Sequence, residues 1–443
     1  MSRIFKRKLY KQLLIWKEES QGRTALLIEG ARRVGKSTLA TTFARQEYES
    51  YILIDFNNVP NRIKNLFNDL TDLNNIFLQL QQHFNVVLKP RKSLIIFDEV
   101  QQCPRARQAI KYLVADGRYD YLETGSLISI KKNTKDITIP SEEERITLHP
   151  MDYEEFRWAI GDTNSTELLE QFFVAKRPLQ AAHRKTMRDF RLYLLVGGMP
   201  QSVNTYLDTN NLSLVDKTKR SIIRLYLDDF QKIDPSGMAE NLFKNIPSQL
   251  SANASRYHPF PVIGNKSQSK IAELMLMLSE SKTATFCYRC TDPMVGMSLN
   301  KDLTRYKIYL ADTGLFVTLC FWDKDYTENI IYQKLLSDKL AVNLGYIYEN
   351  AVAQMLTASG NQLFYYTFPK DEKHNYEIDF LISRGNKLIP IEVKSSGYKS
   401  HTSLDAFCMK YASRLDKRVM IYTKDLVADG DTLLLPAYMT PLL

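Results

Sequence analysis

Cysteines and long apolar runs are both scarce in this chain of 443 residues. Its five cysteines are an odd number spread over a long sequence. Such a set does not suggest a disulfide framework and is typical of a reducing cytoplasm. No apolar run approaches the roughly 20 residues that cross a bilayer, so we expect no membrane segment and no membrane partner. These absences favour a cytoplasmic protein.

Cysteine motifs for metal binding are nearly missing as well. Cys287 and Cys290 form one C-x-x-C, but no second Cys or His pair at zinc spacing accompanies them. The surrounding stretch, TATFCYRC, is an expected strand, on which residues three positions apart face opposite sides. Zinc is therefore not expected.

The N-terminus shows no secretory signal. The stretch MSRIFKRKLYKQLLIW is basic but has no continuous apolar core followed by a small-residue cleavage site, so an amphipathic helix is expected. What the chain does have is positive charge, because 59 Lys and Arg against 50 Asp and Glu give a net charge of +9. This charge suits a polyanionic partner such as nucleic acid.

Length and periodicity predict several domains, since the chain should hold about three at roughly 150 residues each. From residue 24 to 149, near-continuous apolar runs alternate with helical stretches, which is typical of a parallel sheet covered on both faces. Helical periodicity follows, then a helix, helix and strand-ribbon order, then a long helix and more strands. The predicted regions are an ATPase domain (1–150), a helical region (151–237), a winged-helix-like domain (238–328) and a C-terminal domain (329–443).

The winged-helix interpretation of residues 238–328 has an alternative. Winged helices often serve only as packing modules. A helical linker domain that touches no DNA fits the same pattern.

The stretch GARRVGKST carries the phosphate-binding pattern G-x-x-x-x-G-K-[ST] between an expected strand and an expected helix. Its glycines, Gly30 and Gly35, let backbone N–H groups turn inward at a helix N-terminus, whose dipole favours anions. Lys36 would reach the β and γ phosphates of ATP, and the Ser37 hydroxyl would hold Mg²⁺. A purely structural turn is the alternative.

The stretch SLIIFDEV supplies the other half of a nucleotide site. A buried strand ends in Asp98, whose carboxylate can bind the Mg²⁺ shell. Glu99 can polarise a water against the γ phosphate, which indicates hydrolysis. The alternative is an acidic strand end, but ligands of such sheets bind at that edge.

The next strand, YLETGS, ends at the same edge, so Thr124 or Ser126 could sense the γ phosphate. The candidates for an arginine finger are Arg105, Arg107, Arg118 and Arg145. The predicted nucleotide-binding residues are Gly30, Ala31, Arg32, Arg33, Val34, Gly35, Lys36, Ser37, Thr38, Asp98 and Ser126. Lys36 and Glu99 are the predicted catalytic residues of this site.

A second candidate site lies in YEIDFLISRGNKLIPIEVKSS. Gly385-Asn386 predicts a two-residue hairpin turn, which opposes residues whose numbers sum to 771. One face must then be buried. It consists of Ile378, Phe380, Ile382, Ile389, Ile391 and Val393. The other face carries Glu377, Asp379, Glu392 and Lys394.

In that register Asp379 opposes Glu392 with Cβ atoms roughly 5 Å apart. Two ionised carboxylates at that distance repel by roughly 3 kcal/mol at an effective dielectric of 20. A divalent cation turns the repulsion into coordination, and oxygen ligands favour Mg²⁺ or Mn²⁺. Lys394 could position or deprotonate a water there, and Glu349 could add a carboxylate. The alternative is a surface ion pair of Lys394.

These stretches resemble a widespread group of prokaryotic ATP-binding proteins of the extended AAA+ clade. Such proteins carry a winged-helix middle region and a C-terminal restriction-endonuclease-like domain. The resemblance covers nearly the whole chain, including LLIEGARRVGKSTLA, LIIFDEVQ, YLLVGGMPQSV, LGYIYENAVAQML and EIDFLIS. The nuclease pattern matches Glu349, Asp379, Glu392 and Lys394, which implies metal-dependent phosphodiester hydrolysis with Lys394 as a catalytic residue. The chain departs at Glu144, where relatives usually have glycine before the arginine.

The expected fold is α/β and multidomain. It consists of a parallel-sheet P-loop (AAA+-like) ATPase domain, a helical and winged-helix middle region and an α/β restriction-endonuclease-like (PD-(D/E)xK) domain. We expect an ATP-binding and ATP-hydrolysing protein coupled to a Mg²⁺- or Mn²⁺-dependent module that cleaves or binds nucleic acid, DNA foremost. One alternative is an ATP-controlled switch that only binds DNA or a protein, and another is a winged-helix DNA regulator. The sequence is also compatible with a homo-oligomer or a protein partner.

Overall fold

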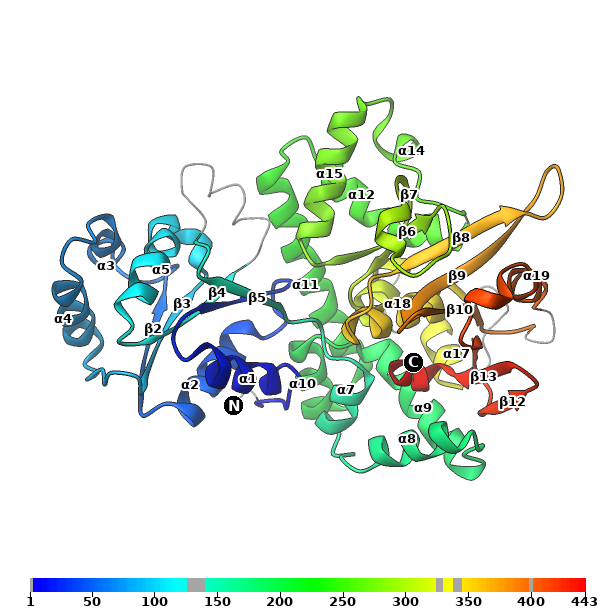
Figure 1. Cartoon of the computed structure of the whole chain (residues 1–443), viewed down its shortest axis with the longest axis horizontal. Coiled ribbons are helices and arrows are strands. Elements are labelled where there is room, and N and C mark those ends of the chain that lie inside the picture. Colours follow the sequence, from blue (N-terminus) through cyan, green and yellow to red (C-terminus); the bar gives the residue numbers. More distant parts are fainter. Residues whose placement is uncertain (1–2, 126–139, 253, 324–329, 338–344, 398–400) are drawn as a thin grey trace. The chain divides into compact units, whose positions relative to one another are not determined.

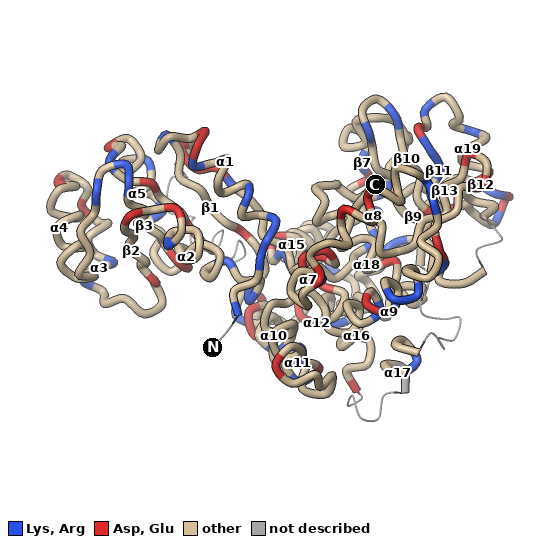
Figure 2. Tube along the Cα trace, turned by 90° about the horizontal axis from the view of Figure 1, so that it is seen from below, with Lys and Arg blue, Asp and Glu red and all other residues tan. Residues whose placement is uncertain are grey.

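The computed structural model describes residues 3–125, 140–252, 254–323, 330–337, 345–397 and 401–443. The chain forms two compact units, Met1–His149 with Glu280–Lys282, and the remainder. Lys and Arg positions are interspersed with Asp and Glu along both units (Figure 2). Within the ranges described, no helix has the length and apolar character needed to cross a membrane.

The first unit is a sheet of five parallel strands in the order β2-β3-β4-β1-β5, with helices on both faces (Figure 1). Its strands are β1 (Ala25–Glu29), β2 (Ser50–Asp55), β3 (Ser93–Asp98), β4 (Asp120–Gly125) and β5 (Glu143–Thr147). Its helices are α1 (Tyr10–Ser20), α2 (Lys36–Glu47), α3 (Asn61–Asn65), α4 (Leu73–Phe84) and α5 (Pro104–Asp116). Every residue of β1, β3 and β4 is buried. The prediction of a parallel sheet covered on both faces is confirmed.

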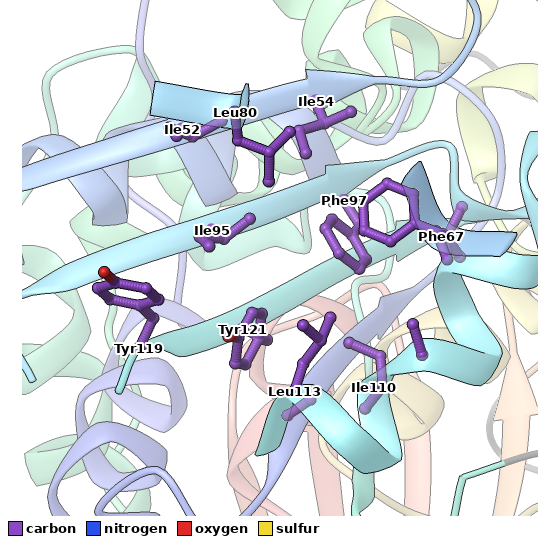
Figure 3. Close-up of a cluster of buried hydrophobic side chains, with 14 of the residues drawn as sticks. Ile52, Ile54, Phe67, Leu80, Ile95, Phe97, Ile110, Leu113, Tyr119 and Tyr121 are labelled. Carbon is purple, nitrogen blue, oxygen red and sulfur yellow. The ribbon is translucent and has the colours of Figure 1, made fainter. Parts of the chain in front are cut away.

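A hydrophobic core of this unit lies between one face of the sheet and helices α4 and α5 (Figure 3). Alternate residues of β2 and β3, such as Ile52 and Phe97, meet Leu80 of α4 and Ile110 of α5. The Phe97 ring packs edge-on against Phe67 with centroids 5.2 Å apart. On the opposite face, α2 packs on β2, β3 and β4, and α1 packs on α2. This packing holds the carboxyl ends of the strands in fixed positions.

Local sequence features mark where helices of this unit begin and end. The Asp72 carboxylate accepts the Asn75 N–H at 3.0 Å and caps the start of α4. Helix α5 begins with Pro104, which has no N–H to leave unpaired there. It ends at Gly117, which has the left-handed φ of 74° common after helices.

The second unit begins with a bundle of helices. They are α7 (Tyr153–Ala159), α8 (Ser165–Ala175), α9 (Ala181–Val196), α10 (Pro200–Thr209), α11 (Leu212–Ile233), α12 (Met238–Lys244), α13 (Ile246–Ser251), α14 (Phe260–Ile263) and α15 (Gln268–Glu280). Asp152 and Glu155 form a capping box at the start of α7. Within the described residues, further helices follow: α16 (Thr313–Cys320), α17 (Ile330–Ser337), α18 (Gly345–Ala358) and α19 (Thr402–Tyr411). The predicted helical middle region is confirmed.

A mixed sheet of eight strands completes the second unit, in the order β12-β13-β11-β10-β9-β8-β6-β7. The strands are β6 (Ala284–Cys290), β7 (Lys301–Leu310), β8 (Phe364–Pro369), β9 (Asn375–Arg384), β10 (Lys387–Lys394), β11 (Arg418–Tyr422), β12 (Val427–Asp429) and β13 (Thr432–Pro436). The ribbon β6-β7 follows helices α12, α13 and α15 in the order that the sequence predicts. It also joins the C-terminal sheet, because β6 pairs in parallel with β8.

The hairpin β9-β10 has the register that its turn predicts, since Arg384 pairs with Lys387 and Phe380 with Ile391. The regular ladder of this hairpin ends there. The pairing of β8 with β9 shifts register between Phe364 and Tyr366. One extra residue on β9 moves Ile378 to the face of Leu381, where both join the core beneath α19. The predicted apolar face is therefore wrong at Ile378.

Helix α18 is fixed against β7 by a buried side chain. The amide of Asn350 accepts the Leu310 N–H at 2.9 Å and donates to the Leu310 carbonyl at 3.2 Å. It also donates to the Thr313 hydroxyl at 3.1 Å. These bonds set the position of the neighbouring residue, Glu349.

Candidate functional site

The predicted P-loop lies between the end of β1 and the start of α2. Gly30 has φ 152° and Gly35 has φ 100°, which are backbone conformations that favour glycine. A Cβ on Gly30 would collide with the Leu148 carbonyl oxygen. The loop is braced by Arg7, whose Nη1 donates to the Val34 carbonyl at 2.9 Å. No motif marks Arg7 in the sequence, and only the basic character of the N-terminus points to it.

Lys36 is buried at the first position of α2. Its Nζ donates to the carbonyls of Gly30 at 3.0 Å and Ala31 at 3.1 Å. Burial lowers the pKa of Lys36, while Glu99 and Asp98 act in the opposite sense. The ammonium is held by neutral backbone oxygens, which phosphate oxygens can replace at a gain in electrostatic energy.

Asp98 lies at the carboxyl end of β3, and its carboxylate accepts hydrogen bonds from two hydroxyl groups. Ser37 Oγ donates to its Oδ1 at 2.7 Å, and Thr124 Oγ1 donates to the same atom. The Glu99 backbone N–H in turn donates to Thr124 Oγ1 at 3.2 Å. The structure thus joins Ser37, predicted from one motif, to Asp98, predicted from another. Of the two predicted sensors, Thr124 lies in this network and Ser126 lies outside the described residues.

Glu99 has a left-handed backbone, with φ 55°. A non-glycine residue in that region is uncommon, and such strain gathers at functional sites. The carboxylate of Glu99 accepts a hydrogen bond from the Gln101 amide. Glu99 directly follows Asp98, the predicted Mg²⁺ ligand, and its role as the residue that activates water stays a prediction.

The four candidate arginine fingers have different partners. Arg107 is buried and bonded to both oxygens of Glu143, at 2.8 Å each. Arg118 donates hydrogen bonds to both carboxylate oxygens of Asp116, at 2.7 and 2.8 Å. Arg145 pairs with Glu143 at 2.7 Å, and the exposed Arg105 reaches Gln108 at 3.0 Å. All four arginines therefore have a partner within the chain, and the identity of a finger stays a prediction.

The residues of this site fit Mg²⁺ and ATP. Two oxygen atoms, Ser37 Oγ and Asp98 Oδ1, lie 2.7 Å apart. Such hard oxygen ligands are those that Mg²⁺ prefers. The adjacent Lys36 and the inward-turning loop suit the phosphates. Apart from Ser126, the rest of the predicted set, Arg32, Arg33 and Thr38 among them, belongs to the same loop and helix start.

The carboxylates of the second candidate site surround a lysine that no sequence motif indicates. Lys307, on β7, is buried and lies 2.6 Å from Glu377 Oε1 and 3.1 Å from Glu349 Oε1. The Tyr309 hydroxyl also donates to Glu349. Burial would lower the pKa of Lys307, yet Glu349, Glu377 and Asp379 together raise it well above its ordinary value. Lys307 is therefore a cation at neutral pH, and it contacts Glu349, one of the three predicted metal ligands.

Asp379 belongs to the same cluster. Its Oδ2 accepts the Val393 N–H at 2.8 Å, across the point where the β9-β10 ladder ends. Burial and then Glu349 raise the pKa of Asp379 to about 8, against the opposing effect of Lys307. This carboxyl group therefore keeps its proton to a higher pH than an exposed aspartate does.

Glu392 and Lys394 form a pair of their own at the end of β10. Lys394 Nζ lies 2.8 Å from Glu392 Oε1, and Glu392 Oε2 is buried with no hydrogen-bond partner among the described residues. Burial would lower the pKa of Lys394, but the hydrogen bond that its ammonium donates to Glu392 raises it. Lys394 is therefore a cation at neutral pH, which suits positioning a charge more than accepting a proton.

These contacts do not fit a three-carboxylate metal site. In the described ranges, no group of three or more His, Cys, Asp or Glu side chains is arranged to hold a metal ion. Glu349 and Asp379 face Lys307, whereas Glu392 faces Lys394. Glu349, Asp379 and Glu392 stay predicted ligands. One signal of Lys307 was available, since a charged residue interrupts the otherwise apolar end of its strand, YKIYL.

Profiles of known families match three parts of the chain. Residues 22–157 match the AAA domain. Residues 187–326 and 344–438 match two domains of unknown function, DUF8612 and DUF4143. No curated protein matches the sequence. Residues 22–157 are thus an AAA+-like P-loop ATPase domain, as the sequence predicts.

Several solved structures are similar in part. The Walker-type ATPase PABY2304 of Pyrococcus abyssi is 17% identical, with a TM-score of 0.43 over 71% of this chain and 96% of its own. The Orc1 protein of Aeropyrum pernix, solved in complex with DNA, is 11% identical, with a TM-score of 0.29 over 72% and 93%. The RuvB Holliday junction branch migration motor of Thermotoga maritima is 13% identical, with a TM-score of 0.27 over 62% and 88%.

Asp379 gives a pH dependence that can be measured. Its folded-state pKa of about 8 lies above the ordinary 3.8. Between those values the folded state keeps a proton that the unfolded state has released, so this group makes stability fall as pH rises. We expect Asp379→Asn to remove that slope. Denaturant unfolding in EDTA from pH 5 to pH 8 measures it. Parallel profiles of the two proteins would contradict the assignment.

Proposed function

We propose that the chain binds and hydrolyses ATP at its P-loop, and that this cycle controls a C-terminal module that binds nucleic acid. The observation that carries the first part is the meeting of Lys36, Ser37 and Asp98 at the carboxyl edge of the first sheet. The match of residues 22–157 to the AAA domain supports it.

Four residues of the chain have separate roles in the proposed hydrolysis. Lys36 exchanges its two carbonyl partners for the β and γ phosphate oxygens. Ser37 and Asp98 would hold Mg²⁺, which when bound neutralises phosphate charge. Glu99 orients a water and takes its proton as the water oxygen bonds to the γ phosphorus. The bond from that phosphorus to the bridging oxygen breaks, and ADP leaves with phosphate.

The C-terminal part is proposed to have a restriction-endonuclease-like fold. Support comes from the mixed sheet, with Asp379 and Glu392 on adjacent strands and Glu349 on the helix that precedes them. The order of α12, α13, α15 and the β6-β7 ribbon supports the winged-helix-like interpretation. The domain boundaries predicted after residue 150 belong to the same proposal.

Binding of nucleic acid is favoured over cleavage at the C-terminal site. A metal-dependent nuclease needs its carboxylates free to hold a cation, but Lys307 already compensates Glu349 and Glu377. Mg²⁺ or Mn²⁺ would have to compete with an ammonium of the same molecule. The alternative that this contact favours is the nucleotide-controlled switch.

The ATPase assignment is tested by two substitutions. Lys36→Ala should lose ATP binding and turnover together, because the phosphates lose their buried cation. Glu99→Gln should still bind ATP but turn over more slowly by about 10² to 10⁴-fold, which is the typical contribution of a general base. The exposed Lys111→Ala is the matched control. Phosphate release and nucleotide titration are the measurements, and unchanged turnover in Lys36→Ala would refute the assignment.

The choice between binding and cleavage is tested by metal titration. Isothermal titration of Mn²⁺ into the full chain and into Asp379→Ala should give equal binding, because Lys307 already pairs with Glu349 and Lys394 with Glu392. Single- and double-stranded DNA should stay intact with Mg²⁺ or Mn²⁺, with and without ATP. A Mn²⁺ site that disappears in Asp379→Ala, together with DNA cleavage, would establish the nuclease instead.

A further inference from the structure

A cavity of about 250 Å³ opens in the second unit, beside the mixed sheet. Three strands and the segment before α14 form its walls. The lining residues are Ser255, Arg256, His258, Arg289, Arg305, Tyr365 and Thr367. None of them belongs to either site described above.

The lining is strongly basic. Three of its side chains are guanidiniums, and none of its lining residues is acidic. Asp302 offsets part of this charge, because it lies 3.7 Å from Arg289 and 3.9 Å from Arg305. Three permanent cations against this one carboxylate leave the cavity positive.

The remaining lining groups are hydrogen-bonding groups rather than apolar ones. Arg289 Nε donates to Thr367 Oγ1 at 3.0 Å, which fixes the direction of its guanidinium. Burial and then Arg256 lower the pKa of His258, so this ring offers a hydrogen bond at neutral pH and not a charge. Guanidinium forks with hydroxyl and imidazole groups are the chemistry that recognises phosphate oxygens.

The size of the cavity limits the ligand. Pockets for whole cofactors and drug-sized ligands measure about 300 to 1,000 Å³. At about 250 Å³ this cavity suits one phosphate group with part of what carries it. The side chain of Arg305 is 48% exposed, so the cavity is open to a longer chain.

The cavity is connected through β8 to the cluster around Lys307. Thr367 is the direct partner of Glu377 in the β8-β9 ladder, so the two side chains share a face of the sheet. Lys307 Nζ lies 5.7 Å from the centre of the Tyr365 ring. We propose that this cavity binds a backbone phosphate of a nucleic acid and so directs the strand along that face. This inference rests on the proposed nucleic-acid-binding function of the C-terminal module.

Removal of two guanidiniums tests the cavity directly. The parent is the full chain with Lys36→Ala, since the P-loop also binds phosphate. Arg256→Gln with Arg305→Gln is added to this parent, and the exposed Arg224→Gln on α11 is the matched control. The probes are a fluorescent single-stranded DNA oligonucleotide, followed by anisotropy at several salt concentrations, and inorganic phosphate, followed by calorimetry. If the double variant does not fold, Arg305→Gln alone replaces it.

The double variant should bind the oligonucleotide at least about tenfold more weakly. Its slope of log affinity against log salt should fall by about 0.7 for each phosphate that the protein no longer neutralises. The control should match the parent. Loss of inorganic phosphate binding, with no oligonucleotide bound by any protein, would assign the cavity to a small phosphate and overturn both the nucleic-acid ligand and that part of the proposed function. Equal affinities of the double variant and the control for both probes, with the oligonucleotide still bound, would overturn the cavity alone.

Discussion

An ammonium enclosed by carboxylates is the interaction on which the second unit depends most. Lys307 lies 2.6 Å from Glu377 and 3.1 Å from Glu349, and Asp379 acts on the same charge. The partners come from β9 and α18, so one side chain of the edge strand β7 joins elements far apart in the sequence. Removing one partner from such a buried set costs about 3 to 5 kcal/mol, because the charges left behind lose their compensation. Strand β7 therefore stabilises the C-terminal module through the ion pairs of Lys307.

The two candidate sites differ in what holds their lysines. Lys36 is bonded to backbone carbonyls, which carry no net charge and can be exchanged for phosphate oxygens. Lys307 forms ion pairs with carboxylates. A cation from solution would have to displace its ammonium to bind these carboxylates. The first arrangement is ready for an anionic ligand, and the second is already neutralised. This contrast is why we propose chemistry at the first site and binding at the second. The basic cavity beside Tyr365 then supplies the positive surface that the cluster around Lys307 does not.

Local patterns predicted much of this structure, and long-range contacts account for what they missed. The apolar runs predicted the five parallel strands, and the Gly385-Asn386 turn predicted the hairpin register as far as Phe380. The P-loop and the Asp98 strand end predicted two halves of a site that the fold joins. No local pattern encodes the extra residue on β9, because it exists only relative to β8. Lys307 was missed for the same reason, since its partners lie more than forty residues away or in another strand.

Hydrogen exchange in the Lys307→Met variant tests the central claim most directly, because exchange in peptides of β7, β9 and α18 reports the stability of this cluster itself. In EDTA the variant should lose protection in all three elements, corresponding to about 3 to 5 kcal/mol. Addition of MnCl₂ should restore that protection in the variant and leave the unsubstituted protein unchanged. Equal protection of the variant and the unsubstituted protein in EDTA would contradict the account.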